Sequence, residues 1–172
     1  MPDPAVAEPI ILWRAYVPRW AHDPLSGAGA ARFGGRWNPV GMPALYASLE
    51  MSTAWAEYNQ GLVQHPALIA RLQLTGAKLC DLTRDTVLAE LGIDPTIHDT
   101  QWRDLLIRSE IPSTYTLCRR LIALGHDSVI YPSAISKGGR CVALWRWNIA
   151  GGPKITVTDP EGRMPHDERS WR

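Results

Sequence analysis

The sequence predicts an α+β fold in which helices flank a mixed, mainly antiparallel sheet. Its 172 residues suit one globular domain, and an apolar fraction of 45% with 20% charged residues is typical of a chain that buries a core. Segments with strand patterns outnumber segments with helix patterns, and the two do not alternate regularly. This order favours α+β over the regular alternation of α/β proteins.

Strands are predicted where short runs are rich in apolar and β-branched residues. In chain order these runs are residues 10–17, 44–47, 67–74, 78–82, 128–131, 141–147 and a short one at 155–157. Between the first two runs, residues 18–38 contain so many Gly, Pro and Ala residues that we expect a long loop there.

Helices are predicted between these strands from capping residues and from the spacing of apolar side chains. Residues 49–60 should form one helix, with Ser48 as its N-cap. Further helices should follow Thr83, Asp99 and Ser113, and glycines should end the first and the last of these.

The domain organisation is expected to be simple. Residues 1–157 should form a single domain, because no internal repeat or low-complexity block divides them. Residues 158–172 contain Pro160 and Pro165 but few large apolar side chains, so we expect a mobile tail.

Charge, cysteine content and the first residues exclude several classes of protein. A net charge of +1 gives no strong attraction to nucleic acid or to an anionic membrane. Three cysteines without a Cys-x-x-Cys pair favour reduced thiols over a disulfide framework or a zinc site. The first residues, MPDPAVAEP, do not resemble a signal peptide, and no run approaches the ~20 apolar residues that span a bilayer. We therefore expect a soluble, cytoplasmic protein.

The common catalytic and nucleotide-binding motifs are absent from the sequence. Gly27 and Gly29 begin like a dinucleotide fingerprint, but Arg32 stands where the third glycine belongs. There is no P-loop, HExxH or GxSxG motif, and the five histidines are scattered without the spacing of metal ligands. The sequence therefore predicts no metal site.

The most unusual segment is Phe-Gly-Gly-Arg-Trp-Asn-Pro at residues 33–39. Two glycines free the backbone for a tight turn or a close approach to a ligand, and Arg36 carries a planar fork suited to phosphate oxygens. The same pattern is equally typical of a structural turn in which Trp37 fills the core. Both interpretations stay open on the residues alone.

Two further polar residues lie near predicted apolar segments. Glu57 lies within the predicted helix 49–60, where its carboxylate faces either solvent or a cleft. Ser133 follows the predicted strand 128–131, at a position where a hydroxyl either meets a ligand or closes a turn.

Taken together, these segments resemble the RES-domain family, which is named for its Arg, Glu and Ser. The matching pieces are Trp13-Arg14, residues 24–30, Gly-Gly-Arg-Trp-Asn at 34–38, Gly41, Leu45-Tyr46-Ala47-Ser48, Ala56-Glu57 and Tyr131-Pro132-Ser133. One position departs from the pattern. Family members often have an asparagine at the start of the last core strand, where this chain has Arg140-Cys141.

The resemblance implies a toxin of a bacterial toxin–antitoxin pair with a fold similar to ADP-ribosyltransferases. It also implies a cleft that binds NAD as substrate, without a metal, and breaks the bond between nicotinamide and ribose. The catalytic residues that it implies are Arg36, Tyr46 and Glu57. The residues expected to bind NAD are Arg36, Tyr46, Ser133, Trp37 and Asn38.

The chemistry of this cleavage is consistent with the residues available. Breaking the bond develops an oxocarbenium-like positive charge on the ribose, and Glu57 is the candidate carboxylate that stabilises it. The acceptor of the ADP-ribosyl group stays open between water, inorganic phosphate and a protein side chain. The alternative function belongs to another class. It is that of a non-enzymatic module, which binds a nucleotide or a protein partner.

The resemblance also implies a protein partner, an antitoxin with a helix-turn-helix DNA-binding part. An anionic group of this partner could satisfy Arg36 in place of phosphate, so we expect the antitoxin to cover the cleft. The assembly would be a homodimer or a hetero-oligomer with the antitoxin. DNA binding should come from the partner, because the net charge of this chain is only +1.

Overall fold

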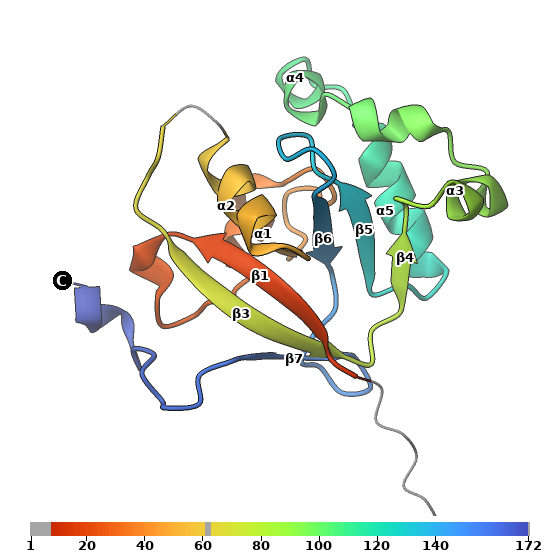
Figure 1. The fold of residues 1–172 in the computed structure, drawn as a ribbon. Coiled ribbons are helices and arrows are strands. Elements are labelled where there is room, and N and C mark those ends of the chain that lie inside the picture. Colours follow the sequence, from red (N-terminus) through yellow and green to blue (C-terminus); the bar gives the residue numbers. More distant parts are fainter. Residues whose placement is uncertain (1–7, 61–62, 172) are drawn as a thin grey trace, which may run out of the picture.

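The computed structural model describes residues 8–60 and 63–171, and this part of the chain contains one seven-stranded sheet (Figure 1). The strands are β1 (Ile10–Tyr16), β2 (Leu45–Ser48), β3 (Leu68–Thr75), β4 (Leu79–Asp81), β5 (Ser128–Pro132), β6 (Arg140–Leu144) and β7 (Lys154–Val157). Their order across the sheet is β4-β5-β6-β2-β1-β3-β7. Strands β4 and β5 run parallel, and all other neighbours are antiparallel. The predicted α+β class with a mixed, mainly antiparallel sheet is confirmed.

Helices pack on this sheet at two places. The α-helices of the described residues are α1 (Ala28–Phe33), α2 (Met51–Asn59), α3 (Asp85–Leu91), α4 (Trp102–Ile107) and α5 (Ser113–Ala123). Short 3-10 turns form η1 (Pro18–Trp20), η2 (Pro95–Asp99) and η3 (Glu168–Trp171). Helix α2 contacts β1, β2 and β6, whereas α3 and α5 lie toward the β4 edge of the sheet (Figure 1). Helix α4 lies near the end of α2, where Arg103 Nη1 donates to Gln60 Oε1 at 3.1 Å.

The strand register brings distant segments together in the middle of the sheet. Ser48, at the end of β2, pairs with Trp13 of β1 on one side and with Cys141 of β6 on the other. Arg14 therefore lies close to the start of β6, although most of the chain separates them in sequence. Helix α2 begins just after β2 and covers this meeting point.

Several local predictions were wrong. Thr83, Asp99 and Ser113 do not cap the later helices, whose N-cap residues are Arg84, Gln101 and Pro112. The predicted loop at residues 18–38 contains η1 and α1, because Ala-rich residues form a short helix that ends at Gly34, where φ is 72°. Ser48 does not cap α2: it stays in β2, its hydroxyl donates to Cys141 Sγ at 3.9 Å, and Glu50 occupies the N-cap position.

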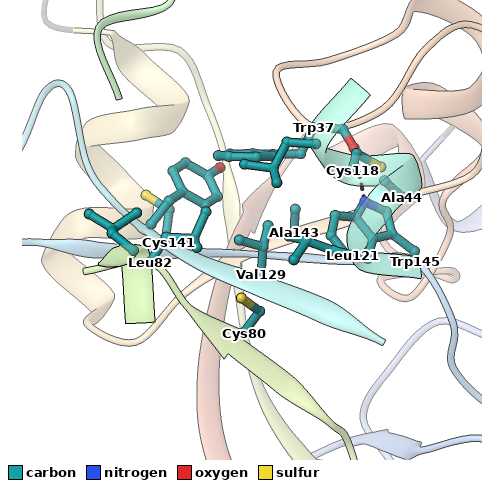
Figure 2. Packing of buried hydrophobic residues seen from close by; sticks show 13 residues of the cluster. Trp37, Ala44, Cys80, Leu82, Cys118, Leu121, Val129, Cys141, Ala143 and Trp145 are labelled. Carbon is teal, nitrogen blue, oxygen red and sulfur yellow. Dashed lines mark hydrogen bonds between the residues drawn. The ribbon is translucent and has the colours of Figure 1, made fainter. Parts of the chain in front are cut away.

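The core consists of two apolar clusters of buried residues. One joins β5 and β6 to α5, where Cys118 and Leu121 pack with Val129 and Ala143, and Trp37 lies in the same cluster (Figure 2). The other gathers buried side chains from β1, β2, β3, β5, β6 and β7. Cys80, Cys118 and Cys141 are all buried and unpaired.

The segment for which the sequence predicts a mobile tail follows a defined course beside β3. The Thr158 amide donates to the Arg71 carbonyl at 2.9 Å, and the Thr158 hydroxyl accepts from Arg71 Nη1 at 2.9 Å and Gln73 Nε2 at 3.2 Å. Farther on, η3 contacts η1. The domain boundary at residue 157 stays a prediction. Among the described residues, no helix combines the length and the apolar character needed to cross a membrane.

Candidate active site

A cavity of about 730 Å³ opens between α2, α4 and the centre of the sheet. This volume lies in the usual range for a site that binds a small molecule. Its wall includes three residues expected from the sequence to be catalytic, Arg36, Tyr46 and Glu57. The other chemically distinctive residues on the wall are Arg14, Trp13, Phe33, Trp102, Arg103, Asp104, Tyr131 and Cys141.

The turn that carries Arg36 depends on two adjacent glycines. Gly34 has a φ of 72°, a value that favours glycine, and the Gly35 amide donates to the Asn38 carbonyl at 2.9 Å. A Cβ atom on Gly35 would lie 2.5 Å from the Tyr46 hydroxyl oxygen and 2.7 Å from Asn38 Oδ1. The second glycine therefore lets the turn pack directly on Tyr46, and Arg36 follows at the cavity wall.

The Tyr46 hydroxyl holds this turn in place. It accepts a hydrogen bond from the Trp37 amide at 2.9 Å and donates one to Asn38 Oδ1 at 2.7 Å. Burial raises the pKa of Tyr46 well above its ordinary value, so the hydroxyl stays protonated and able to donate. Its ring contributes to the cavity wall, while its oxygen is occupied by the turn.

Trp37 and Asn38 lie beneath the site and not on its wall. Both are fully buried, and the Trp37 carbonyl accepts from Trp145 Nε1 at 2.9 Å (Figure 2). The centre of the Trp37 ring lies 5.4 Å from that of the Tyr131 ring. Asn38 Nδ2 donates to the carbonyls of Ala30, Pro39 and Met42. Both residues therefore support the turn, and their expected contact with NAD stays a prediction.

The Arg36 guanidinium makes few interactions within the described part of the chain. The side chain is half-buried, Nη1 donates to the His98 carbonyl at 3.3 Å, and the guanidinium lies 6.0 Å from the centre of the Tyr131 ring. Among the described residues, no carboxylate forms an ion pair with it. The remaining N–H groups of Arg36 can therefore bind an anion in the cavity.

Glu57 is fixed through one of its two carboxylate oxygens. Oε1 accepts a hydrogen bond from Ser133 Oγ at 2.6 Å and a longer one from Cys141 Sγ at 3.5 Å. Within the described part of the chain, no group donates a hydrogen bond to Oε2. One oxygen thus holds the carboxylate still and the other is available to a ligand.

The Ser133 hydroxyl makes all of its hydrogen bonds within the protein. While it donates to Glu57, its oxygen accepts from the amides of Ile135 at 3.1 Å and Ser136 at 2.8 Å. The residue is not among those that line the cavity. The structure thus brings Ser133 to Glu57 and gives it a positioning contact, and the binding of substrate that the resemblance implies stays a prediction.

Arg14 is a candidate residue to which the sequence analysis assigned no role. It lines the cavity from β1, Nη2 donates to the Ser26 carbonyl at 3.0 Å, and Nη1 is buried without a partner among the described residues. Burial lowers the pKa of Arg14 to about 10, although the nearby carboxylate of Asp23 opposes the shift. The signal available in the sequence was an arginine inside an otherwise apolar strand.

The cavity wall combines three guanidinium groups with two carboxylates. The cations are Arg14, Arg36 and Arg103, and the anions are Glu57 and Asp104. A wall of this kind suits a ligand that carries several negative charges and one centre that becomes positive. No group of His, Cys, Asp and Glu side chains in the described residues could hold a metal ion.

Replacing Tyr46 by Phe tests whether its hydroxyl supports the turn. Tyr46→Phe leaves the Trp37 amide and the Asn38 Oδ1 atom without this partner, so the free energy of unfolding should fall by about 1–3 kcal/mol. Tyr58→Phe is the matched control, because that hydroxyl donates to the Pro66 carbonyl at an exposed position. Urea denaturation measures both, and equal losses would contradict the assignment.

The Cys141 thiol should react slowly in the folded protein. Burial, assisted by the charge of Glu57, raises the pKa of Cys141 from 9.0 to about 12, so below pH 9 its thiolate fraction is about 10³ lower than that of an ordinary cysteine. Alkylation by iodoacetamide at pH 8, followed by mass spectrometry of the Cys141 peptide, should be slower than in the denatured chain by at least this factor. A native rate similar to the denatured rate would contradict the shift.

Comparison with known proteins gives a family match and a similar fold. The family model described as RES domain matches residues 11–167, which is most of the chain. A solved structure similar to this one is the M. tuberculosis MbcT–MbcA toxin–antitoxin complex, with a TM-score of 0.60, 19% sequence identity, and coverage of 90% of this chain and 87% of that chain. At this identity the likeness shows a shared fold. No curated protein sequence matches the chain. The chain belongs to the RES-domain family.

Proposed function

We propose that this RES-domain protein is the toxin of a toxin–antitoxin pair and that it cleaves the nicotinamide–ribose bond of NAD, which depletes NAD and arrests growth. The observation that carries the proposal is the geometry of Glu57. Its carboxylate is fixed through Oε1 by Ser133, and it lies on the wall of a cavity that also presents Arg14 and Arg36.

Glu57 supplies the charge that this reaction needs. As the bond breaks, positive charge develops on the ribose, and a fixed carboxylate beside it stabilises the transition state without having to reorganise. A pair of unit charges about 4 Å apart is worth ~4 kcal/mol at an effective dielectric constant of 20, which corresponds to roughly 10³ in rate. Nicotinamide leaves as a neutral molecule, so the reaction needs no strong general acid.

The two arginines bind the diphosphate of NAD in this proposal. Arg36 has N–H groups that make no ion pair among the described residues, and Arg14 has a buried Nη1 atom without a partner there. An anion that bridges the two guanidiniums satisfies both through charge-assisted hydrogen bonds. The Tyr46 ring, on the same wall, offers a face on which nicotinamide can stack.

The acceptor of the ADP-ribosyl group is a small molecule, water or inorganic phosphate, in the proposed reaction. Incubation of the purified protein with NAD and identification of the product tests this directly. Free ADP-ribose indicates water, a phosphorylated ADP-ribose indicates phosphate, and label on a protein indicates a transferase. Unchanged NAD would contradict the enzymatic proposal and favour a binding module.

The antitoxin partner is proposed to cover the cavity. Two large apolar side chains at the cavity wall are exposed, Phe33 at 70% and Ile135 at 47%, and such side chains are typical of surfaces that bind another protein. An anionic group of the partner would satisfy the same arginines that bind phosphate. The similar M. tuberculosis protein was solved within a toxin–antitoxin complex, which supports this kind of partner. In this proposal, a helix-turn-helix part of the antitoxin binds DNA.

Removing the charge of Glu57 should remove most of the activity. Glu57→Gln keeps the size of the side chain but loses the negative charge, so the rate of NAD consumption should fall by at least about 10². Glu90→Gln, at an exposed position on α3, is the matched control and should retain the wild-type rate. Release of nicotinamide measures both variants, and full activity of Glu57→Gln would overturn the mechanism.

Replacing Arg36 should weaken binding of the substrate. Arg36→Lys keeps the charge but loses the planar fork, so KM for NAD should rise by about tenfold or more with a smaller change in kcat. Arg32→Lys serves as the control, since Arg32 is exposed on α1. Steady-state kinetics over a range of NAD concentrations give both constants. A lower melting temperature with unchanged kinetics would indicate that Arg36 only stabilises the turn.

Binding of the antitoxin should prevent cleavage of NAD. Expression of this chain alone should be toxic, co-expression with the adjacent open reading frame should be tolerated, and the isolated complex should neither bind nor cleave NAD. Calorimetric titration of NAD into the complex and into the free chain compares the two. A complex that cleaves NAD at the rate of the free enzyme would contradict occlusion of the cavity.

A further inference from the structure

The start of β6 runs along one face of α2, the helix that carries Glu57. Arg140 makes the first contact, with Glu50 at the N-cap of the helix. Its backbone amide donates to Glu50 Oε2 at 2.9 Å, its Nε donates to Oε1 at 3.0 Å, and its Nη2 lies 3.0 Å from the same oxygen. The Leu49 amide also donates to the Arg140 carbonyl at 2.9 Å. Backbone and side chain of Arg140 therefore both hold the beginning of α2.

The backbone of Gly139 makes the second contact, with Thr53 of α2. This close approach is possible because glycine has no side chain. A Cβ atom on Gly139 would lie 2.3 Å from Thr53 Oγ1 and 2.8 Å from Thr53 Cγ2. Thr53 is buried, and its hydroxyl donates to Glu50 Oε2 at 3.3 Å. The backbone at Gly139 thus packs directly against the first turn of the helix.

Cys141 makes the third contact, through the thiol that donates to Glu57 Oε1 at 3.5 Å. Thr53 and Glu57 are one turn apart in α2 and share one face, and Glu50 is the N-cap residue that precedes the helix. Consecutive residues 139–141 therefore engage the N-cap residue and two positions along that face. The last of them is the proposed catalytic carboxylate.

Helix α2 is also held by packing on β1 and by hydrogen bonds from Ser133 Oγ to Glu57 Oε1 and from the Tyr58 hydroxyl to the Pro66 carbonyl. It has no side-chain hydrogen bond at its N-cap, and its buried residues are Thr53, Ala54 and Asn59. The ion pair itself is partly exposed, with 51% of the Arg140 side chain and 34% of the Glu50 side chain accessible, and such pairs add little to stability. The ion pair would matter because it fixes the position of α2, since small displacements of a catalytic group lower the rate far more than they lower stability.

We propose that residues 139–141 form a clamp on α2 and that Glu50, Arg140 and Cys141 are positioning residues for Glu57. The kinetic consequence rests on the proposed cleavage of NAD, whereas the structural consequence does not. Loss of the clamp leaves the carboxylate in the cavity but lets its helix shift, so the bound substrate reacts more slowly.

The structural arm of the test is amide hydrogen exchange of α2, followed by mass spectrometry. In Glu50→Ala, amides of residues 51–59 should exchange at least about tenfold faster, while β3 and α5 keep the wild-type pattern. Glu161→Ala is the matched control, because Glu161 is exposed and pairs with Arg163 in the segment after β7. Glu50→Gln, which retains an acceptor oxygen for the Arg140 amide, should show a smaller increase and serves if Glu50→Ala does not fold. Exchange in α2 that neither Glu50 variant changes would overturn the clamp.

The kinetic arm separates positioning from contact with substrate. Glu50→Ala and Cys141→Ala should each lower kcat for NAD by about tenfold or more, with KM within about twofold of the wild-type value. Cys80→Ala, at another buried cysteine outside the cavity wall, should change neither constant. Cys141→Ser, which keeps a donor for Glu57, should recover most of kcat. Adding Arg140→Ala to Glu50→Ala should cause little further loss, because the two act through one interaction.

The two arms distinguish the possible failures. If α2 exchange responds as expected but the wild-type protein does not consume NAD, the clamp stands and the proposed function fails. If NAD is consumed and kcat is unchanged in both alanine variants, Glu57 does not depend on the clamp and the inference is wrong. A rise in KM without a change in kcat would make Cys141 a substrate contact instead.

Discussion

The hydrogen bonds of the Tyr46 hydroxyl are the interaction on which the rest of the site depends. This buried oxygen accepts from the Trp37 amide and donates to Asn38, and Asn38 in turn uses its amide nitrogen on carbonyls around it. The network leaves Arg36 as the member of the turn whose polar end reaches the cavity. Because the partners are buried, any one left unpaired carries a desolvation cost, so the turn has one favoured shape.

The Glu57 carboxylate is fixed by a different part of the chain, and the sheet order brings it to the same cavity as Arg36. Strand β2, which carries Tyr46, lies between β1 with Arg14 and β6 with Cys141. Helix α2 follows β2 and places Glu57 where Ser133, just after β5, and Cys141 can bind the same oxygen. Cations and carboxylate thus come from separate elements on a rigid support, which is the arrangement that electrostatic catalysis requires. The fold therefore matters to function mainly through the adjacency of β1, β2 and β6.

The sequence could predict the strands and the residue types of the site, but not how each polar group is used. Apolar runs located β1, β3 and β5, and the structure brings Arg36, Tyr46 and Glu57 to one cavity wall. Whether an asparagine binds a ligand or the backbone depends on carbonyls from other segments, so the burial of Asn38 was not visible in its own motif. The sequence likewise assigns Arg14 no role, because the lack of a partner for its Nη1 atom is visible only in the structure. The binding of NAD by these residues stays a prediction.

A crystal structure of the Glu57→Gln variant with bound NAD tests the central claim most directly, because the dinucleotide should survive in the inactive site. The account predicts that the bond between nicotinamide and ribose lies beside the side chain at position 57, with the diphosphate on the guanidinium groups of Arg36 and Arg14. Nicotinamide should lie against the Tyr46 ring, while Trp37 and Asn38 stay covered. NAD bound outside this cavity, or bound within it with the diphosphate away from both arginines, would contradict the account.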